Sequence, residues 1–231
     1  RIAVDTAEIG EPAVVRMVRG VRRVAPRRRV ESLPTADPLR AVLDREARTA
    51  LVPAVLLFAD GPGRVAADPR FESIVAVGRS VVHVLAPVGS DPDPTAALRV
   101  ATGPAGSASR RLFALAQPWL PDGFSSVPLA SSDAEAAAEA LDRGAADLAI
   151  VVATLGRPDI EAVLRGGRVR LVDATPWLRP ESRLALPFLR QTVIPEAYYV
   201  PDQPVLRSVA MQRVMVGPAP PDRRRVLGRG G

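Results

Sequence analysis

The segment Leu43-Asp44-Arg45-Glu46-Ala47-Arg48-Thr49-Ala50-Leu51-Val52 is echoed 98 positions later by Leu141-Asp142-Arg143-Gly144-Ala145-Ala146-Asp147-Leu148-Ala149-Ile150. The same offset relates Arg1-Ile2-Ala3-Val4 to Arg99-Val100-Ala101-Thr102. These echoes predict two similar α/β lobes with a cleft between them, and such clefts commonly bind small ligands. The alternative is that any two strand-helix-strand units look alike in a chain rich in Arg, Ala and Val.

Short apolar runs alternate with helix-like runs along the whole chain. Strands are predicted over residues 1–5, 29–33, 50–52, 73–77, 81–86, 98–102, 125–129, 148–152, 169–172 and 205–216. Helices are predicted over residues 10–21, 37–48, 106–115, 133–143, 159–164 and 180–189. This alternation is typical of an α/β fold with mostly parallel sheets and helices on both faces. Residues 61–69 and 87–94 are predicted loops, and the second is the expected passage between the lobes.

The residue types that are missing exclude several kinds of chemistry. The chain has no Cys, no Lys and one His, His83, so thiol nucleophiles, Schiff bases and His-rich metal sites are ruled out. His83 lies in an apolar run and is interpreted as a structural residue of a strand. No pair of acidic residues stands out for acid/base work. We therefore expect a protein that is not an enzyme and that uses no cofactor and no metal.

The net charge of +6 comes entirely from arginine, which is spread through the chain. Aromatic residues make up only 4% of it, too few for the stacking platforms of a nucleic-acid binder. The longest apolar stretches are far shorter than the ~20 residues that span a bilayer. We therefore expect no nucleic-acid partner and no membrane span in this chain. No signal peptide is evident at its start, so an exported protein would already have lost its signal; a cytosolic protein is the alternative.

The sharpest local feature is Thr102-Gly103-Pro104-Ala105-Gly106-Ser107-Ala108-Ser109-Arg110, which follows a predicted strand and opens a predicted helix. The free amides of a first helical turn, together with two serine hydroxyls, make a ready anion site. A capped helix start needs no ligand, however, and both interpretations stay open on this segment alone.

The order of several further motifs resembles a known family. After Thr102 to Ser107 come Ala140-Leu141-Asp142-Arg143-Gly144-Ala145-Ala146-Asp147-Leu148-Ala149, Pro187-Phe188-Leu189-Arg190, Ile194-Pro195-Glu196-Ala197-Tyr198-Tyr199 and Pro204-Val205-Leu206-Arg207-Ser208-Val209-Ala210. In this order and spacing they are similar to the solute-binding subunits of the TAXI subfamily of TRAP transporters. The resemblance covers most of the chain and is best over residues 73–216.

The resemblance implies a two-lobed type II periplasmic binding fold, with residues 1–86 and 205–231 in lobe I and 87–204 in lobe II. It implies a periplasmic or extracytoplasmic protein that captures a small organic anion, such as an amino acid or dicarboxylate, without catalysis. The partners would be that carboxylate-containing solute and the subunits of a membrane transporter or another membrane-associated protein, with any membrane anchor outside this chain. The ligand-binding residues that it implies are Thr6, Thr35, Gly106, Ser107, Ala108, Ser109, Ala153, Thr154 and Tyr199.

The chain departs from the family pattern in the first lobe. Glu8 and Glu11 stand at a helix start that would otherwise receive an anion, and we expect them to satisfy its amides. Pro53 replaces the usual Gln, and a Gly/Pro/Arg-rich tail replaces the closing helices. These departures favour an alternative function, a degenerate domain that serves as a sensory or protein-interaction module in a larger assembly. An enzyme on the same fold is a third alternative. Arg40, Arg110 and Arg157 are suitable carboxylate partners by residue type alone.

Overall fold

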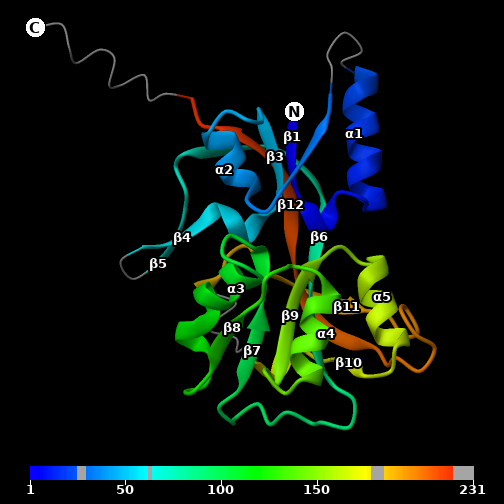
Figure 1. Cartoon of the computed structure of the whole chain (residues 1–231). Coiled ribbons are helices and arrows are strands. Elements are labelled where there is room, and N and C mark those ends of the chain that lie inside the picture. Colours follow the sequence, from blue (N-terminus) through cyan, green and yellow to red (C-terminus); the bar gives the residue numbers. More distant parts are fainter. Residues whose placement is uncertain (25–29, 62–63, 178–184, 221–231) are drawn as a thin grey trace, which may run out of the picture.

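The computed structural model describes residues 1–24, 30–61, 64–177 and 185–220, and its two halves repeat one strand arrangement (Figure 1). In the first lobe, β1 (Ile2–Asp5) pairs in parallel with β2 (Ser32–Thr35) and β3 (Thr49–Pro53). In the second lobe, β7 (Arg99–Thr102) pairs in the same way with β8 (Ser125–Pro128) and β9 (Leu148–Ala153). The segments that echo each other in the sequence thus lie at equivalent places in two similar units.

Two long strands run through both lobes and join them. Strand β6 (Phe71–Pro87) is antiparallel to β12 (Leu206–Pro218) and then, over Val81 to Leu85, to β9. Strand β12 is also antiparallel to β3. The strand order is therefore β2-β1-β3-β12-β6-β9-β7-β8, with β10 (Val169–Val172) added to β6 and β11 (Arg190–Ile194) added to β12. The predicted α/β class is confirmed, but the sheet is mixed, because the two joining strands run against their neighbours.

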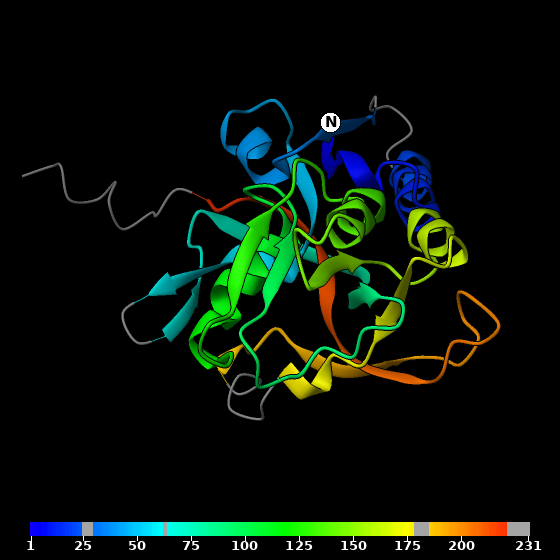
Figure 2. The same ribbon diagram turned by 60° about the horizontal axis from the view of Figure 1, so that its bottom comes forward.

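The helices lie on both faces of this sheet and begin at capping residues. They are α1 (Pro12–Val24), α2 (Pro38–Leu43), α3 (Ala108–Ala116), α4 (Ala134–Asp142) and α5 (Pro158–Arg165), with short 3-10 turns η1 (Thr6–Glu8), η2 (Ala54–Leu57), η3 (Gln117–Trp119) and η4 (Thr175–Trp177). The side chains of Asp37, Ser107 and Asp133 accept hydrogen bonds from first-turn amides and so start α2, α3 and α4. In Figure 2, α1 and α5 lie on one side of the molecule and the hairpin of β4 (Phe58–Gly61) and β5 (Arg64–Ala67) lies on the other.

Several predicted elements differ from the observed ones. The predicted strands 73–77 and 81–86 are one strand, β6, which continues through Gly78 at φ 152°. The predicted helix 37–48 ends at Leu43, and the chain then turns through Arg45, whose φ is 62°. The β4–β5 hairpin occupies part of the predicted loop 61–69, and β11 was not predicted. Residues 180–184 of the predicted helix 180–189 fall outside the described residues, and residues 186–189 are not helical.

The last residues of β6 pair with β9 and β10, directly before the loop 87–94 that was predicted as the passage between the lobes. The lobe boundaries at residues 86 and 205 stay a prediction. A shared apolar cluster also joins the lobes, because Val55 of the first lobe is buried with Leu112 and Phe113 of α3. Among the described residues, no helix has the length and apolar character needed to cross a bilayer.

Candidate functional site: the seam between the lobes

Arg213 is fully buried where the two lobes meet. It lies in the middle of β12, between Gln212 and Val214, and its side chain is 1% exposed. Its Nη1 donates to Glu11 Oε2 at 2.6 Å, and its Nη2 donates to Glu8 Oε2. Glu8 ends η1, which is held by a hydrogen bond from the Ala7 amide to the Asp5 carboxylate, and Glu11 directly precedes α1. The first lobe thus holds one guanidinium against two buried carboxylates.

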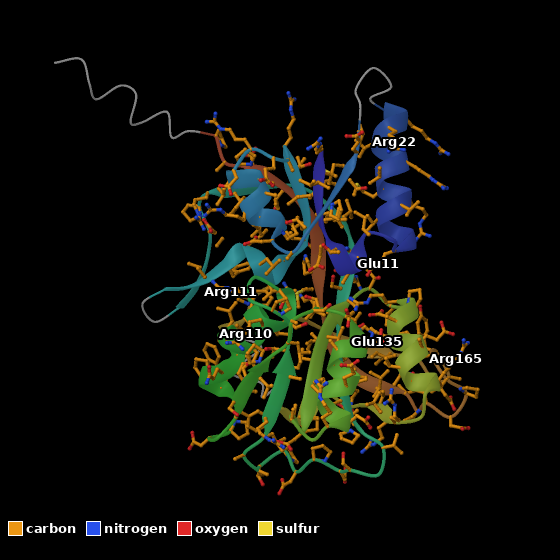
Figure 3. All side chains as sticks on the ribbon, viewed as in Figure 1. Glu11, Arg22, Arg110, Arg111, Glu135 and Arg165 are labelled. Atoms are coloured by element: carbon orange, nitrogen blue, oxygen red, sulfur yellow. The ribbon has the colours of Figure 1, made fainter. Side chains whose placement is uncertain are left out.

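Side chains of the second lobe donate hydrogen bonds to the first lobe. Thr154, directly after β9, donates from Oγ1 to Glu11 Oε2 at 2.9 Å. Arg111 of α3 donates from Nε and Nη2 to the Phe58 carbonyl oxygen at 2.8 and 2.6 Å. Figure 3 shows Glu11 and Arg111 on opposite lobes, each beside the line where the lobes meet. We call this contact region the seam; direct hydrogen bonds between side chains and backbone of the two lobes hold it closed.

A second buried arginine approaches the seam from lobe II. Arg157 stands at the start of α5, is 3% exposed, and donates from Nε to Asp159 Oδ1 at 2.6 Å. A cavity of about 20 Å³ is enclosed by Arg157, by Asp5 and Glu8 of the first lobe, and by Ala108 and Ser109 of α3. This volume is about that of a single water molecule. An amino acid or a dicarboxylate does not fit into the seam as it stands.

The charges in the seam are unbalanced toward negative. Among the described residues, the carboxylates of Asp5, Glu8, Glu11 and Asp159 face two buried guanidinium groups, those of Arg157 and Arg213. Burial raises the pKa of Glu8 to about 7, and the charges of Glu11 and Asp5 act in the same direction against the opposing effect of Arg213. Burial also raises the pKa of Asp5. The seam therefore retains a proton at a pH where exposed carboxylates have lost theirs.

Two polar atoms of this group have no hydrogen-bond partner among the described residues: Glu11 Oε1 and Arg213 Nε. Glu11 and Arg213 are both buried, so these unsatisfied atoms carry a desolvation cost. The described residues hold no group of three His, Cys, Asp or Glu side chains placed to bind a metal ion.

The helix start predicted as an anion site does lie at the seam, but the protein uses its polar groups internally. The Ser107 hydroxyl accepts from the Arg110 amide at 3.2 Å, and the Ser109 hydroxyl accepts from the Val152 amide at 3.0 Å. Gly106 has φ +84° and faces Asp37 of the first lobe, 3.6 Å from where a Cβ would stand. Ala108 and Ser109 line the small cavity, and Thr154 bonds Glu11.

The other predicted ligand residues are not brought to the seam cavity. Thr6 is exposed, Thr35 accepts from the Asp37 amide, and Ala153 is buried in β9. The expectation that Glu8 and Glu11 cap helix amides is wrong for the carboxylate oxygens that form hydrogen bonds. These oxygens accept from Arg213 and Thr154, because a buried guanidinium is a stronger donor than a helix amide.

Tyr199 belongs to a buried network with His83. Its hydroxyl accepts from the Gly156 amide at 3.0 Å and lies 2.8 Å from His83 Nε2. His83 Nδ1 is 3.1 Å from the Val81 carbonyl oxygen, which can only accept, so Nδ1 carries the ring proton and Tyr199 donates to Nε2. Burial lowers the pKa of His83 to about 4 and raises that of Tyr199. This network supports the interpretation of His83 as structural.

Sequence reasoning missed Arg213. Its signal is an arginine at the centre of a predicted strand in which Val209 to Met211 and Val214 to Val216 are apolar, so that an unpaired buried charge would be very costly. Such a residue requires a buried acidic partner, and its partners are Glu8 and Glu11, the two acids expected instead to satisfy helix amides.

No known protein family and no curated protein matches the chain. Solved structures do match. A histidine kinase sensor domain with similarity to periplasmic binding proteins aligns with a TM-score of 0.59 and 13% identity, over 99% of this chain and 85% of that chain. The glutamate-bound GluR0 ligand-binding core from Nostoc punctiforme aligns with a TM-score of 0.55 and 15% identity, over 97% and 87%. Arginine-bound ArgBP from T. maritima, as a point variant, aligns with 0.54 and 12%, over 94% and 85%. At these identities the likeness shows the fold alone. The class is the type II periplasmic binding fold.

Proposed function

We propose that this chain is a two-lobed domain of a sensory or protein-interaction kind, in which Glu8 and Glu11 stand where a two-lobed binding protein would hold the carboxylate of a solute. The observation that carries the proposal is the buried contact of both glutamates with Arg213, closed from the other lobe by Thr154. With only about 20 Å³ left in the seam, its own side chains keep the lobes together.

Guanidinium and hydroxyl donors from two lobes are what a binding cleft offers a carboxylate. Here Arg213 supplies the guanidinium and Thr154 supplies the hydroxyl, and both already bond one oxygen of Glu11. The two lobes therefore close without a solute, and a partner protein recognises the closed conformation. Catalysis is not part of this proposal.

This proposal is tested by chemical rescue, in which a free carboxylate replaces a deleted side-chain carboxylate. Glu11→Ala removes the carboxylate but leaves Arg213 paired with Glu8, so the variant keeps a balanced pair and an empty space beside Thr154. Acetate has the size of the deleted group. We expect thermal unfolding of the variant to shift upward with acetate or formate, whereas the wild type does not respond to these or to a panel of amino acids and dicarboxylates. A ligand at about 100 times its dissociation constant adds roughly 2.7 kcal/mol.

Glu135→Ala is the matched control, because Glu135 is exposed on α4 and its loss creates no such space. Adding Arg213→Met to Glu11→Ala should abolish the acetate response. An acetate response equal in Glu11→Ala and Glu135→Ala would contradict the proposal, as would a Glu11→Ala variant that stays unresponsive while folding cooperatively.

The second candidate is the extracytoplasmic capture of a small organic anion for a TRAP-type transporter. It is favoured by Ala108 and Ser109, two predicted ligand residues that line the seam cavity together with Arg157. Under this function the lobes open, and a solute displaces Glu11 from Arg213. The wild type would then be stabilised by one member of the same panel, and bulky replacements of Ser107 and Ser109 would abolish that response.

A further inference from the structure

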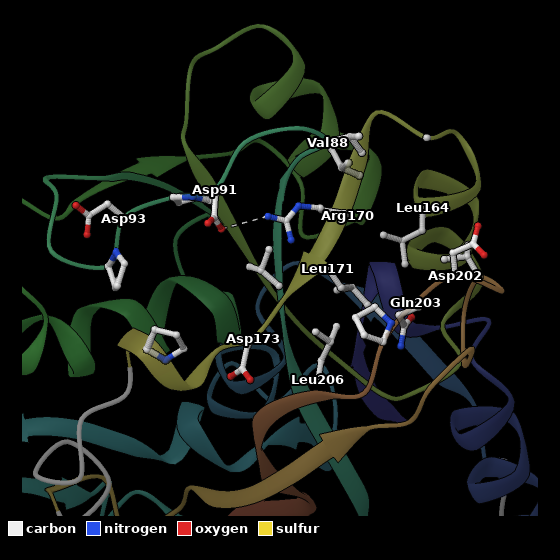
Figure 4. Close-up of a pocket in the computed structure, with 18 residues that line it drawn as sticks. Val88, Asp91, Asp93, Leu164, Arg170, Leu171, Asp173, Asp202, Gln203 and Leu206 are labelled. Carbon is white, nitrogen blue, oxygen red and sulfur yellow. Dashed lines mark ion pairs between the residues drawn. The ribbon is translucent and has the colours of Figure 1, made fainter.

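A large concavity lies away from the seam, on the second lobe. It has a volume of about 950 Å³ and is lined by β10, by the segment 88–94 after β6 and by the loop that connects β11 to β12 (Figure 4). None of the seam residues Glu8, Glu11, Arg157 and Arg213 lines it. Its volume is at the upper end of the range for ligand pockets. We call it the β10 crevice.

One wall of the β10 crevice is an unpaired strand edge. Within the described chain β10 pairs only with β6, from Val169 opposite Pro87 to Val172 opposite Val84. All four residues of β10 line the crevice, so the edge away from β6 borders it. The next backbone bond comes after the strand has ended, from the Ala174 amide to the Arg207 carbonyl oxygen at 2.9 Å. An unpaired edge offers amides and carbonyls to an incoming strand.

The crevice is acidic although the chain as a whole has a net charge of +6. Four carboxylates line it, those of Asp91, Asp93, Asp173 and Asp202, and one guanidinium, that of Arg170. Asp173 is also paired with Arg207, whose Nε lies 3.1 Å from Asp173 Oδ2. Arg170 is already engaged, because it donates to the Ser90 carbonyl oxygen at 2.7 Å and lies 3.5 Å from Asp91 (Figure 4). This charge pattern is complementary to a cationic occupant.

Apolar and amide groups complete the lining. Leu171 and Leu206 are 5% and 7% exposed and present aliphatic surface. Gln203 is 6% exposed; its Nε2 donates to the Pro195 carbonyl oxygen at 2.8 Å, and its Oε1 accepts no hydrogen bond from a described residue. A buried acceptor without a donor is unusual in a folded protein.

We propose that the β10 crevice binds an extended peptide segment of a partner protein, in which arginine or lysine side chains alternate with aliphatic ones. The segment adds to β10 as a further strand. Because side chains alternate along a strand, the aliphatic ones face Leu171 and Leu206 while the basic ones reach Asp93 and Asp202. The strand edge is what selects a peptide over a simple polyamine, which could use the carboxylates but not the backbone. This site is independent of the function proposed for the seam.

The test is fluorescence anisotropy with a labelled short peptide of alternating valine and arginine. One control is a peptide of alternating valine and glutamate. The other is the valine and arginine peptide with every second backbone amide N-methylated, so that the strand has no N–H donors along one edge. We expect the basic peptide to bind and the other two to bind at least about tenfold more weakly, since each lacks either the charge or the strand hydrogen bonds. Backbone amide resonances of β10 should shift during the titration.

Asp93→Asn with Asp202→Asn should weaken binding of the basic peptide about tenfold, whereas the matched variant Asp122→Asn, on an exposed turn of the same lobe, should not. The proposal is overturned if the basic peptide fails to bind at millimolar concentration, or if the acidic or N-methylated peptide binds equally well. It is also overturned if the Asp93 and Asp202 variant binds like the wild type, or if spermidine displaces the peptide while the β10 amides stay unshifted.

Discussion

Thr154 Oγ1 donates to Glu11 Oε2 across the seam at a distance of 2.9 Å. This hydrogen bond joins the end of β9 in one lobe to a buried carboxylate of the other, and the same oxygen also accepts from Arg213. The hydrogen bond from Thr154 therefore joins the two lobes and at the same time satisfies the buried carboxylate of Glu11.

Replacing Thr154 by Val keeps the shape of the side chain and removes the donor. We expect a loss of about 1.5–3 kcal/mol in the free energy of unfolding, because the hydrogen bond goes to a charged group. Urea denaturation measures this loss. Thr192→Val is the control, since Thr192 lies on β11 away from the seam and has no side-chain hydrogen bond among those described; its loss should be smaller. Equal losses for both variants would show that the interlobe bond contributes nothing specific.

Replacing Arg213 by Met leaves Glu8 and Glu11 buried without a cation. A broken buried ion pair of this kind costs about 3–5 kcal/mol. The combined change Glu8→Leu, Glu11→Met and Arg213→Met removes all three charges, and we expect it to recover most of that stability, since apolar replacements of buried ion groups are often neutral or stabilising. Both variants are compared by denaturant unfolding at pH 7. A triple variant as unstable as Arg213→Met alone would mean that packing at Arg213, rather than its charge, supports the seam.

The sequence predicted the repeated units well because apolar runs and helix caps are local signals. Asp37, Ser107 and Asp133 cap their helices as residues of their type commonly do, and strands that echo each other in sequence occupy equivalent places. The seam could not be predicted in the same way. Glu11 and Arg213 are 202 positions apart, and nothing in either local segment indicates that β12 returns beside η1. Likewise, the hydroxyls of Ser107 and Ser109 were expected to donate to an anion, but in the fold both oxygens accept hydrogen bonds from backbone amides.

Tyr199→Phe removes the hydroxyl that links the Gly156 amide to His83 Nε2. The ring still fills its place, but one buried acceptor on His83 loses its donor, so we expect a loss of about 1–3 kcal/mol in the free energy of unfolding. Tyr198→Phe is the control, because Tyr198 is adjacent and 43% exposed. Both are measured by thermal and urea unfolding. A loss for Tyr198→Phe as large as for Tyr199→Phe would contradict the assignment of Tyr199 to a structural network.

The pH dependence of stability should carry the signature of Glu8. Its pKa is about 7 in the folded chain against 4.5 for an ordinary glutamate, so between these values the folded state holds a proton that the unfolded state has released. The contribution of Glu8 to stability is therefore present below pH 4.5, falls as the pH rises to 7 and is constant above. His83 acts in the opposite direction: its pKa of about 4 against 6.5 costs stability as the pH falls from 6.5 to 4.

Subtracting the free energy of unfolding of Glu8→Gln from that of the wild type cancels the effect of His83 and isolates that of Glu8. We expect this difference to decrease by on the order of 3 kcal/mol between pH 4.5 and 7 and to stay level from pH 7 to 9. Glu135→Gln, at an exposed position, should give a difference that is flat over the whole range. A difference that instead rises with pH would mean that attraction to Arg213 outweighs burial and repulsion by Glu11, and that the seam holds no proton near neutrality.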